Sequence, residues 1–190
     1  MNRLPIEYFE KTYANDSDPW GFSSRWYEAR KYALTLAALP HFRYERAFEP
    51  GCSIGVLTEK LAQRCDGVVS SELVPEVAER ARERVKHLAN VEVRSMAIPD
   101  VWPEGEFDLI VLSEIVYYLT SEGVSALLKC MDRSLRPGGH VVAVHWTGKT
   151  DYPLTGEAVH ARLDLHRSWR HLSHYREREF MLSVYERRLG

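Results

Sequence analysis

The sequence has no apolar run that approaches the ~18–20 residues needed for a membrane-spanning helix. Its N-terminus, from Met1 to Pro5, lacks the long apolar core of a signal peptide. It also carries little excess charge. The formal net charge is −2 at pH 7, so nothing in the composition indicates a nucleic-acid partner or an anionic membrane surface. These absences favour a cytoplasmic globular protein.

Cysteine is also scarce. The three cysteines, Cys52, Cys65 and Cys130, form no Cys-x-x-Cys pair, and an odd number cannot all be disulfide-bonded. A reducing compartment is therefore expected. No spacing of histidine, aspartate and glutamate is typical of a metal site, so we expect no bound metal. With 190 residues and no linker, internal repeat or low-complexity tract, the chain is expected to form one domain.

From residue 46 onward, short β-rich runs alternate with helical patterns. Residues 107–112 form a nearly continuous apolar run, which is typical of a strand buried on both faces. We expect Pro137-Gly138-Gly139 to end the helix before the fifth strand. The alternation predicts a doubly wound, Rossmann-like α/β fold with a mostly parallel sheet. Expected strands are residues 46–49, 67–72, 91–94, 107–112 and 140–145, and expected helices are residues 55–65, 75–86 and 121–135.

The two ends of the chain break this alternation. After an expected helix at residues 155–165, two strand-like stretches at 171–176 and 180–187 are separated by only three residues. That connection is too short for a helical crossover, so the stretches must pair as an antiparallel hairpin and complete a seven-stranded sheet. Residues 1–45 are rich in aromatic side chains and show no strand signal. We therefore expect a helical cap (1–45) on a Rossmann-like core (46–190).

The first expected strand runs into the loop Glu49-Pro50-Gly51-Cys52-Ser53-Ile54-Gly55, and a helical pattern follows. In an open α/β sheet such a loop lies at the crevice beyond the carboxyl ends of the strands, where ligands bind. The N–H groups at the start of the following helix favour an anion, whereas the Glu49 carboxylate could hold an ammonium group. An amino-acid moiety carries both groups and suits both ends of the loop. The alternative is a simple turn with two glycines.

Glu72 ends the second expected strand, 17 residues after Gly55. An acid at this place accepts hydrogen bonds from a ribose diol in nucleotide-binding sheets, although a strand-end glutamate is often only solvated. Together with Glu49 it describes a nucleoside joined to an amino acid, and S-adenosyl-L-methionine fits that description. A nicotinamide dehydrogenase, the competing enzyme class, would need a Gly-x-Gly-x-x-Gly loop, which is missing.

Over roughly residues 45–187 the chain resembles the class I S-adenosylmethionine-dependent methyltransferases. The motifs that carry this resemblance are Glu49-x-Gly51-x-x-x-Gly55, Glu72, Phe107-Asp108-Leu109-Ile110-Val111 and Leu135-Arg136-Pro137-Gly138-Gly139-His140. The chain also resembles, more narrowly, the nodulation S (NodS-like) branch. Some enzymes of that branch N-methylate the free amine of a deacetylated chitooligosaccharide, and other members act on other small acceptors. The narrower resemblance lies in Asp18-Pro19-Trp20, Tyr27-Glu28-x-Arg30-Lys31-Tyr32 and Ser113-Glu114-Ile115-Val116-Tyr117-Tyr118-Leu119.

The resemblance implies a set of cofactor-binding positions, and two of them depart from the family pattern. Ser53 stands where the family loop usually has glycine. Ala97 aligns where an acid usually meets the adenine amino group, so that contact must come from backbone or be absent, with Asp100 as a weaker substitute. Met96 and Ile98 would pack on the adenine faces. The implied cofactor-binding residues are Trp20, Arg30, Glu49, Gly51, Ser53, Gly55, Glu72, Leu73, Met96, Ala97, Ile98 and Ser113.

Three residues past the fourth and fifth expected strands are catalytic candidates. Methyl transfer is an in-line displacement at an activated methyl group, so the protein must align the acceptor and free its lone pair. Glu114 could orient or deprotonate an amine, or only support the cofactor loop. Tyr118 could hydrogen-bond the acceptor, or pack under the next helix. His145 has a titration range suited to a base, but a histidine at a strand end can equally be structural.

The aromatic N-terminal segment is expected to fold over the cofactor, with Trp20, Tyr27 and Arg30 in the lid. Ordinary packing of these side chains against the sheet is the alternative. Arg30 could pair with the carboxylate of the methionine moiety, and the Trp and Tyr faces suit a stacked sugar.

We interpret the sequence as a metal-free, S-adenosyl-L-methionine-dependent N-methyltransferase acting on a small-molecule acceptor, with the amine of an amino sugar or saccharide as the first choice. One alternative is an O-methyltransferase acting on a natural-product hydroxyl. The other is a catalytically inactive relative that still binds the cofactor. The sequence carries no signal for the oligomeric state.

Overall fold

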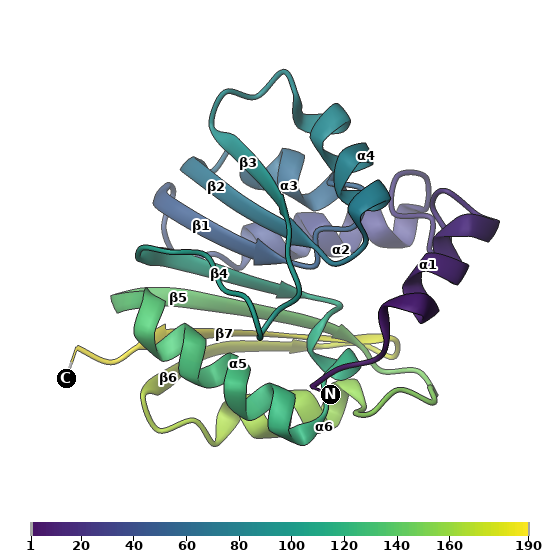
Figure 1. Cartoon of the computed structure of the whole chain (residues 1–190). Helices are drawn as coiled ribbons and strands as arrows, with labels where there is room; N and C mark the ends of the chain where they lie inside the picture. Colours follow the sequence, from purple (N-terminus) through teal and green to yellow (C-terminus); the bar gives the residue numbers. More distant parts are fainter. Residues whose placement is uncertain (1, 190) are drawn as a thin grey trace.

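A seven-stranded mixed sheet, in the order β3-β2-β1-β4-β5-β7-β6, forms the centre of the computed structural model, which describes residues 2–189 (Figure 1). The strands are β1 (Tyr44–Pro50), β2 (Cys65–Glu72), β3 (Val91–Ser95), β4 (Phe107–Ser113), β5 (Leu135–Trp146), β6 (Trp169–Arg176) and β7 (Phe180–Arg187). The helices are α1 (Ile6–Asn15), α2 (Trp26–Ala37), α3 (Val56–Leu61), α4 (Pro75–Val85), the 3-10 helix η1 (Val116–Tyr118), α5 (Ser121–Ser134) and α6 (Gly156–Asp164).

Helices cover both faces of the sheet, and the central strands are apolar on both sides. In β5, Val142 and Val144 belong to the same buried cluster as Leu57 of α3, whereas the alternate residues Val141 and Ala143 pack with α5 and α6. This period of two follows from the pleat of a strand, which turns successive side chains to opposite faces. The layered arrangement confirms the predicted doubly wound, Rossmann-like sheet.

The strand order reverses at β1, which lies between β2 and β4. β1 pairs with β2 from Tyr44 to Pro50, but it pairs with β4 only at Ala47↔Leu109 and Phe48↔Ile110. The first five strands are parallel to one another. β7 lies antiparallel between β5 and β6, so the predicted C-terminal hairpin is confirmed. Whether the first 45 residues act as a cap separate from the core stays a prediction.

All four helices expected after residue 46 end before the expected residue, and two of these differences have a clear structural reason. The helix expected at residues 55–65 ends at Leu61, because Cys65 already pairs with Tyr44 as the first residue of β2. The helix expected at residues 121–135 ends at Ser134, three residues before Pro137. The Pro137-Gly138-Gly139 segment lies instead in an irregular start of β5, where the pairing with β4 jumps from Phe107↔Leu135 to Leu109↔His140. Proline has no N–H group to donate to a ladder, which suits a bulge.

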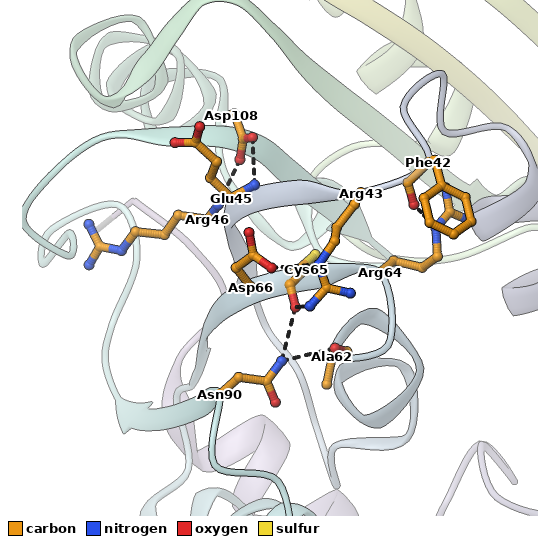
Figure 2. A network of polar contacts seen from close by, with 10 residues as sticks. All are labelled: Phe42, Arg43, Glu45, Arg46, Ala62, Arg64, Cys65, Asp66, Asn90 and Asp108. Atoms are coloured by element: carbon orange, nitrogen blue, oxygen red, sulfur yellow. Dashed lines mark hydrogen bonds and ion pairs between the residues drawn. The ribbon is translucent and has the colours of Figure 1, made fainter.

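A polar network ties together the amino ends of the strands, on the edge of the sheet opposite the loop after β1 (Figure 2). The Asp108 carboxylate of β4 accepts hydrogen bonds from the backbone N–H groups of Glu45 and Arg46 in β1, both at 2.8 Å. The Asn90 amide donates to the carbonyls of Ala62 and Cys65 at 2.9 and 3.0 Å. Because β1 and β4 share only two residue pairs, the Asp108 contacts replace ladder hydrogen bonds that the strands do not make.

Within residues 2–189, no helix combines the length and the apolar character that a membrane crossing requires.

Replacing Asp108 with alanine should lower the free energy of unfolding by about 2 kcal/mol, since hydrogen bonds to charged groups contribute roughly 1.5–3 kcal/mol. Urea denaturation of both proteins measures the difference. Asp66→Ala is the matched control. Asp66 also pairs near this edge, at 2.5 Å from Arg43, but both side chains are about half-exposed. Its loss should cost less than about 1 kcal/mol. Equal losses in the two variants would contradict the proposed role of Asp108.

Candidate functional site

A cavity of about 500 Å³ opens beyond the carboxyl ends of β1, β2 and β4. Helix α1 lies on this side of the sheet (Figure 1). Its walls come from all parts of the chain, including the N-terminal helices and the segments after β4 and β5. Most of the residues expected to bind or react lie in its lining. These are Trp20, Glu49, Gly51, Ser53, Glu72, Leu73, Met96, Ile98, Ser113, Glu114 and Tyr118. The loop after β1 therefore meets the crevice at the point where strand order reverses, as expected.

Glu49, next to the end of β1, presents a buried carboxylate to this cavity. Its Oε2 accepts hydrogen bonds from the hydroxyls of Thr58 (2.5 Å) and Ser70 (2.9 Å). Within residues 2–189 no group donates a hydrogen bond to Oε1, which leaves that oxygen for a ligand in the cavity. Burial raises the pKa of Glu49 to about 7, in spite of the two hydroxyl groups. A cation placed beside this carboxylate would restore its ionised form.

Glu72, the last residue of β2, is held against the cavity wall by three backbone N–H groups. Oε1 accepts from Leu73 (2.9 Å) and Val74 (3.1 Å), and Oε2 accepts from Ser53 (3.0 Å). Burial nevertheless raises the pKa of Glu72 above its ordinary value. These three hydrogen bonds hold the carboxylate in one orientation, so the directions of its remaining lone pairs are fixed. A fixed carboxylate of this kind is what the recognition of a pair of hydroxyl groups requires.

The loop between β1 and α3 adopts left-handed backbone at Gly51 (φ +72°), Ser53 (φ +51°) and Gly55 (φ +79°). A Cβ atom at Gly51 would lie 2.3 Å from Cδ1 of Ile115, so glycine lets this loop approach the segment after β4. Left-handed backbone at a serine lowers the stability of the folded state by roughly 1–2 kcal/mol. Its hydroxyl forms a 2.5 Å hydrogen bond with the phenol of Tyr13 in α1. The side chain that replaces the family's usual glycine thus ties α1 to the loop.

The N-terminal aromatic residues form part of the cavity wall. Trp20 meets the Tyr13 ring edge-on and stacks against Phe22, with ring centroids 5.3 and 5.5 Å apart. Phe9 of α1 meets Tyr118 edge-on at 5.0 Å. These contacts bring α1 and the segment before α2 next to η1. The same side chains therefore both pack together and line the cavity, and whether they close over a cofactor stays a prediction.

At the other end of the cavity, Glu114 takes part in a buried group of three charges. Its Oε2 accepts from the Tyr117 hydroxyl (2.6 Å) and from the backbone N–H of Trp146 (2.8 Å). Its Oε1 pairs with Nζ of Lys31 at 2.6 Å, and the same Nζ lies 2.9 Å from Oε2 of Glu28. Lys31 and Glu28 belong to α2 and are 2% and 4% exposed. Neither residue was predicted from the sequence to belong to the site.

The spacing of Glu28 and Lys31 explains why they were missed. A Glu–Lys pair three residues apart on a helix is ordinarily a surface ion pair. Nothing in the local sequence shows that this face of α2 lies against the end of β4. The one available signal was their place in the Tyr27–Tyr32 motif shared with the NodS-like branch.

Four predicted site residues do not line the cavity. His145 is fully buried behind its wall, where Nε2 accepts from the backbone N–H of Val116 (3.3 Å) and Nδ1 bonds to His160 (3.2 Å). Burial and the neighbouring His160 hold the pKa of His145 well below its usual range. In this position His145 holds η1, which carries Tyr117 and Tyr118, and cannot meet a substrate directly.

The other three lie outside the cavity lining for different reasons. Arg30 points to the hairpin, where it pairs with Glu177 (2.5 Å) and Tyr175 (3.2 Å). Gly55 precedes α3 with left-handed backbone, and a Cβ atom there would lie 3.3 Å from Ala81, so the backbone and the packing both favour glycine. Ala97 is half-buried outside the lining, between Met96 and Ile98, which do line the cavity. The substitute acid Asp100 also lies elsewhere, ion-paired with Arg3 at 2.5 Å.

The site has two chemically different ends. One offers the open Glu49 oxygen, the glycine loop, the fixed Glu72 carboxylate and the apolar side chains of Met96 and Ile98, which together fit a nucleoside that carries an amino group. The other offers Glu114 among tyrosines and Trp146. Within residues 2–189 no group of three or more His, Cys, Asp or Glu side chains is arranged to hold a metal ion.

Comparison with known proteins gives consistent matches. The family model of nodulation protein S (NodS) matches residues 7–144. Nodulation protein S of Rhizobium tropici is 34% identical over 128 residues, which cover 66% of this chain and 53% of that protein. The chain thus spans about half the length of the curated relatives that it matches.

Two solved structures share most of the fold. A proposed methyltransferase from Pseudomonas syringae is 42% identical with a TM-score of 0.77, covering 86% of this chain and all of the other. The N-methyltransferase NodS from Bradyrhizobium japonicum WM9, solved with S-adenosyl-L-homocysteine, has a TM-score of 0.84 at 24% identity, covering 95% and 97% of the two chains. At that identity the second match shows the fold alone.

The protonation of Glu49 should be visible in the stability of the protein. The folded-state pKa of Glu49 is raised from about 4.5 to about 7, so between these values the folded state binds the proton that the unfolded state has lost. Stability must then fall as pH rises from 5 to 8, by up to about 3 kcal/mol from this group. Glu49→Gln should remove that contribution.

Urea denaturation at pH 5, 6, 7 and 8 checks this expectation as the difference between wild type and variant, which cancels other titrating groups. Glu10→Gln, at an exposed site on α1, should follow the wild-type curve. If the stability difference between wild type and Glu49→Gln does not change with pH, Glu49 is not the group that titrates.

Proposed function

Because the chain belongs to the NodS family, we propose that it is an S-adenosyl-L-methionine-dependent methyltransferase acting on a small-molecule acceptor. The observation that carries this proposal is the Glu49 carboxylate, which is buried next to the end of β1 and keeps one oxygen open to the cavity. A buried acid that needs a cation fits the ammonium group of an amino-acid moiety. It fits a pyrophosphate poorly, because the two negative charges would repel.

Each part of the cofactor has a matching group in the first end of the cavity. Glu49 binds the ammonium group, the backbone of the Gly51–Ser53 loop approaches the ligand, and Glu72 accepts hydrogen bonds from the ribose diol. Met96 and Ile98 pack on the adenine, and Trp20 covers this end of the cavity. The bound cofactor supplies a methyl group on a sulfonium, which needs no further activation.

The acceptor belongs at the other end, near Glu114 and the aromatic side chains. We take it to be the amine of a sugar or saccharide. Trp146 is 36% exposed beside the cavity, and aromatic faces of this kind suit a sugar ring. The carboxylate of Glu114 favours a positively charged acceptor over a neutral one. Tyr118, which contacts Phe9 of α1, completes this end of the wall.

The setting proposed for this reaction is the cytoplasm, with no nucleic-acid or membrane partner. The three cysteines are free and buried in the structure, which suits a reducing compartment. The formal net charge of −2 provides no basic surface for nucleic acid.

Cofactor binding is tested by thermal shift with S-adenosyl-L-homocysteine and, separately, with NAD. The wild type should be stabilised by S-adenosyl-L-homocysteine and not by NAD. Glu49→Gln should weaken the binding of S-adenosyl-L-homocysteine about 10- to 100-fold, the equivalent of one charged hydrogen bond. Binding to the wild type should also weaken as pH falls below 7, because protonated Glu49 cannot hold an ammonium group. Stabilisation by NAD alone would end the proposal.

The acceptor is tested with radiolabelled S-adenosyl-L-methionine and a panel of small molecules. The panel contains glucosamine, a chitotetraose with one free amine, the N-acetylated forms of both, and simple phenols. Label should enter only the two free amines. Transfer to phenols alone would identify an O-methyltransferase. Binding of S-adenosyl-L-homocysteine with no transfer to any member of the panel would indicate an inactive relative.

A further inference from the structure

Three buried charges lie together at the acceptor end of the cavity and form one charge cluster, Glu28, Lys31 and Glu114. The Lys31 ammonium joins the two carboxylates, at 2.9 Å from Glu28 and 2.6 Å from Glu114. Its side chain is 2% exposed, and its Nζ also lies 4.9 Å from the centre of the Tyr27 ring. Glu28, Lys31, Glu114 and Tyr27 all line the cavity. With both acids ionised, the cluster carries one net negative charge.

The two carboxylates of the cluster differ in how they are held. Glu114 uses both oxygens, one for Lys31 and the other for the Tyr117 hydroxyl and the Trp146 N–H. Glu28 has no such support. Within residues 2–189 its buried Oε2 accepts no hydrogen bond, so the 2.9 Å contact with Lys31 is an ion pair alone. Among the same described residues, the neighbouring Tyr27 hydroxyl is also buried without a hydrogen-bond partner.

A buried polar atom that makes no hydrogen bond costs free energy unless a ligand supplies the missing partner. Within residues 2–189, Oε2 of Glu28 and Oη of Tyr27 are two such atoms, and both residues line the end of the cavity assigned to the acceptor. Burial also raises the pKa of Glu28, against the opposing effect of Lys31. A group with these properties is suited to exchange a proton with a bound ligand.

Methyl transfer to an amine requires such an exchange. Below the pKa of its amine, a sugar amine arrives as an ammonium ion, which has no lone pair and cannot react. We propose that Glu28 takes up the proton that the acceptor ammonium must lose, and that Lys31 and Glu114 position Glu28 for this step. This inference rests on the proposed function and assigns the reaction a base that the sequence analysis did not name.

The step balances in atoms and charge. An N–H bond of the ammonium breaks, its electron pair stays on nitrogen, and the proton bonds to a carboxylate oxygen of Glu28. The nitrogen lone pair then forms the bond to the methyl carbon, while the electron pair of the carbon–sulfur bond goes to sulfur. The product is an N-methylammonium ion and a neutral thioether. Glu28 loses its proton to solvent when the product leaves.

The charge of the cluster also explains a preference for amines. An ammonium ion beside the ionised cluster brings the local charge to zero, whereas a neutral hydroxyl leaves one buried negative charge uncompensated. The other ionisable groups facing Glu28 are Arg25, which precedes α2, and the phenols of Tyr27 and Tyr32. The two phenols stay neutral because burial raises the pKa of each. They therefore leave the charge balance unchanged. The Arg25 side chain is exposed, so solvent and salt screen its charge.

The competing explanation is that the cluster is only a buried ion pair that anchors α2. The pH dependence of the rate separates the two roles. In Glu28→Gln, only acceptor that is already neutral in solution can react. Its kcat/KM should therefore rise tenfold for each pH unit until the acceptor amine titrates. The wild type should be much less dependent on pH over the same range, and at pH 7 the variant should be about 100-fold slower.

The measurement uses the full chain, radiolabelled S-adenosyl-L-methionine and the chitotetraose with one free amine, from pH 5.5 to 9.5. Thermal shift with S-adenosyl-L-homocysteine verifies that each variant folds and binds cofactor. Glu83→Gln is the matched control. Glu83 also precedes a lysine by three residues on a helix, but both side chains are exposed. This variant should reproduce the wild-type profile.

Lys31→Met provides a second, independent variant. Removing the cation should move the acidic limb of the wild-type profile to higher pH by at least one unit, because Glu28 then holds its proton more tightly. A Glu28→Gln profile parallel to that of the wild type would overturn the proposal, as would a Lys31→Met profile with an unshifted acidic limb. A wild type that binds S-adenosyl-L-homocysteine but methylates no amine would instead show that the proposed function had failed.

Discussion

The site depends on the short pairing between β1 and β4. Two residue pairs, Ala47↔Leu109 and Phe48↔Ile110, join the strands, and the Asp108 carboxylate continues the connection toward their amino ends. Toward their carboxyl ends the two strands lead into separate loops, one starting just after Glu49 and the other starting at Glu114. The cavity lies between these loops. Glycine at position 51 lets them approach, because a Cβ atom there would meet Ile115.

Around this cavity the fold accepts several locally unfavourable features. Glu49, Glu72, Glu28 and Lys31 are almost fully buried, and Ser53 and Glu114 have left-handed backbone. Burying charge and straining backbone both lower stability, and such features collect at functional sites. In this protein each of these features also positions a polar group at the cavity. Left-handed Ser53 directs its N–H to Glu72, and Glu114 contacts both Lys31 and the last residue of β5, Trp146.

The sequence predicted the sheet better than it predicted the acceptor end of the site. Alternating apolar runs located all seven strands, and the three-residue connection after residue 176 required the hairpin. The family resemblance is confirmed by the NodS family match. Glu49 and Glu72 were found from their places at strand ends, because topology alone brings those ends to one crevice. Ser53 replaces the expected glycine in the loop after β1, and its hydroxyl forms a hydrogen bond with Tyr13.

Residues whose roles depend on distant partners could not be assigned in this way. His145 has the same strand-end position as a catalytic base, but His160 and the Val116 N–H enclose it. Arg30 and Lys31 are adjacent in sequence, but they lie on different faces of α2. Arg30 therefore pairs with Glu177, whereas Lys31 pairs with Glu114. The amino-acid sequence by itself determined where the strands lie along the chain and which acids stand at their ends, because strand positions follow from local periodicity. Only the tertiary structure decided which charges are buried together, because the burial of a side chain depends on segments far away in the chain.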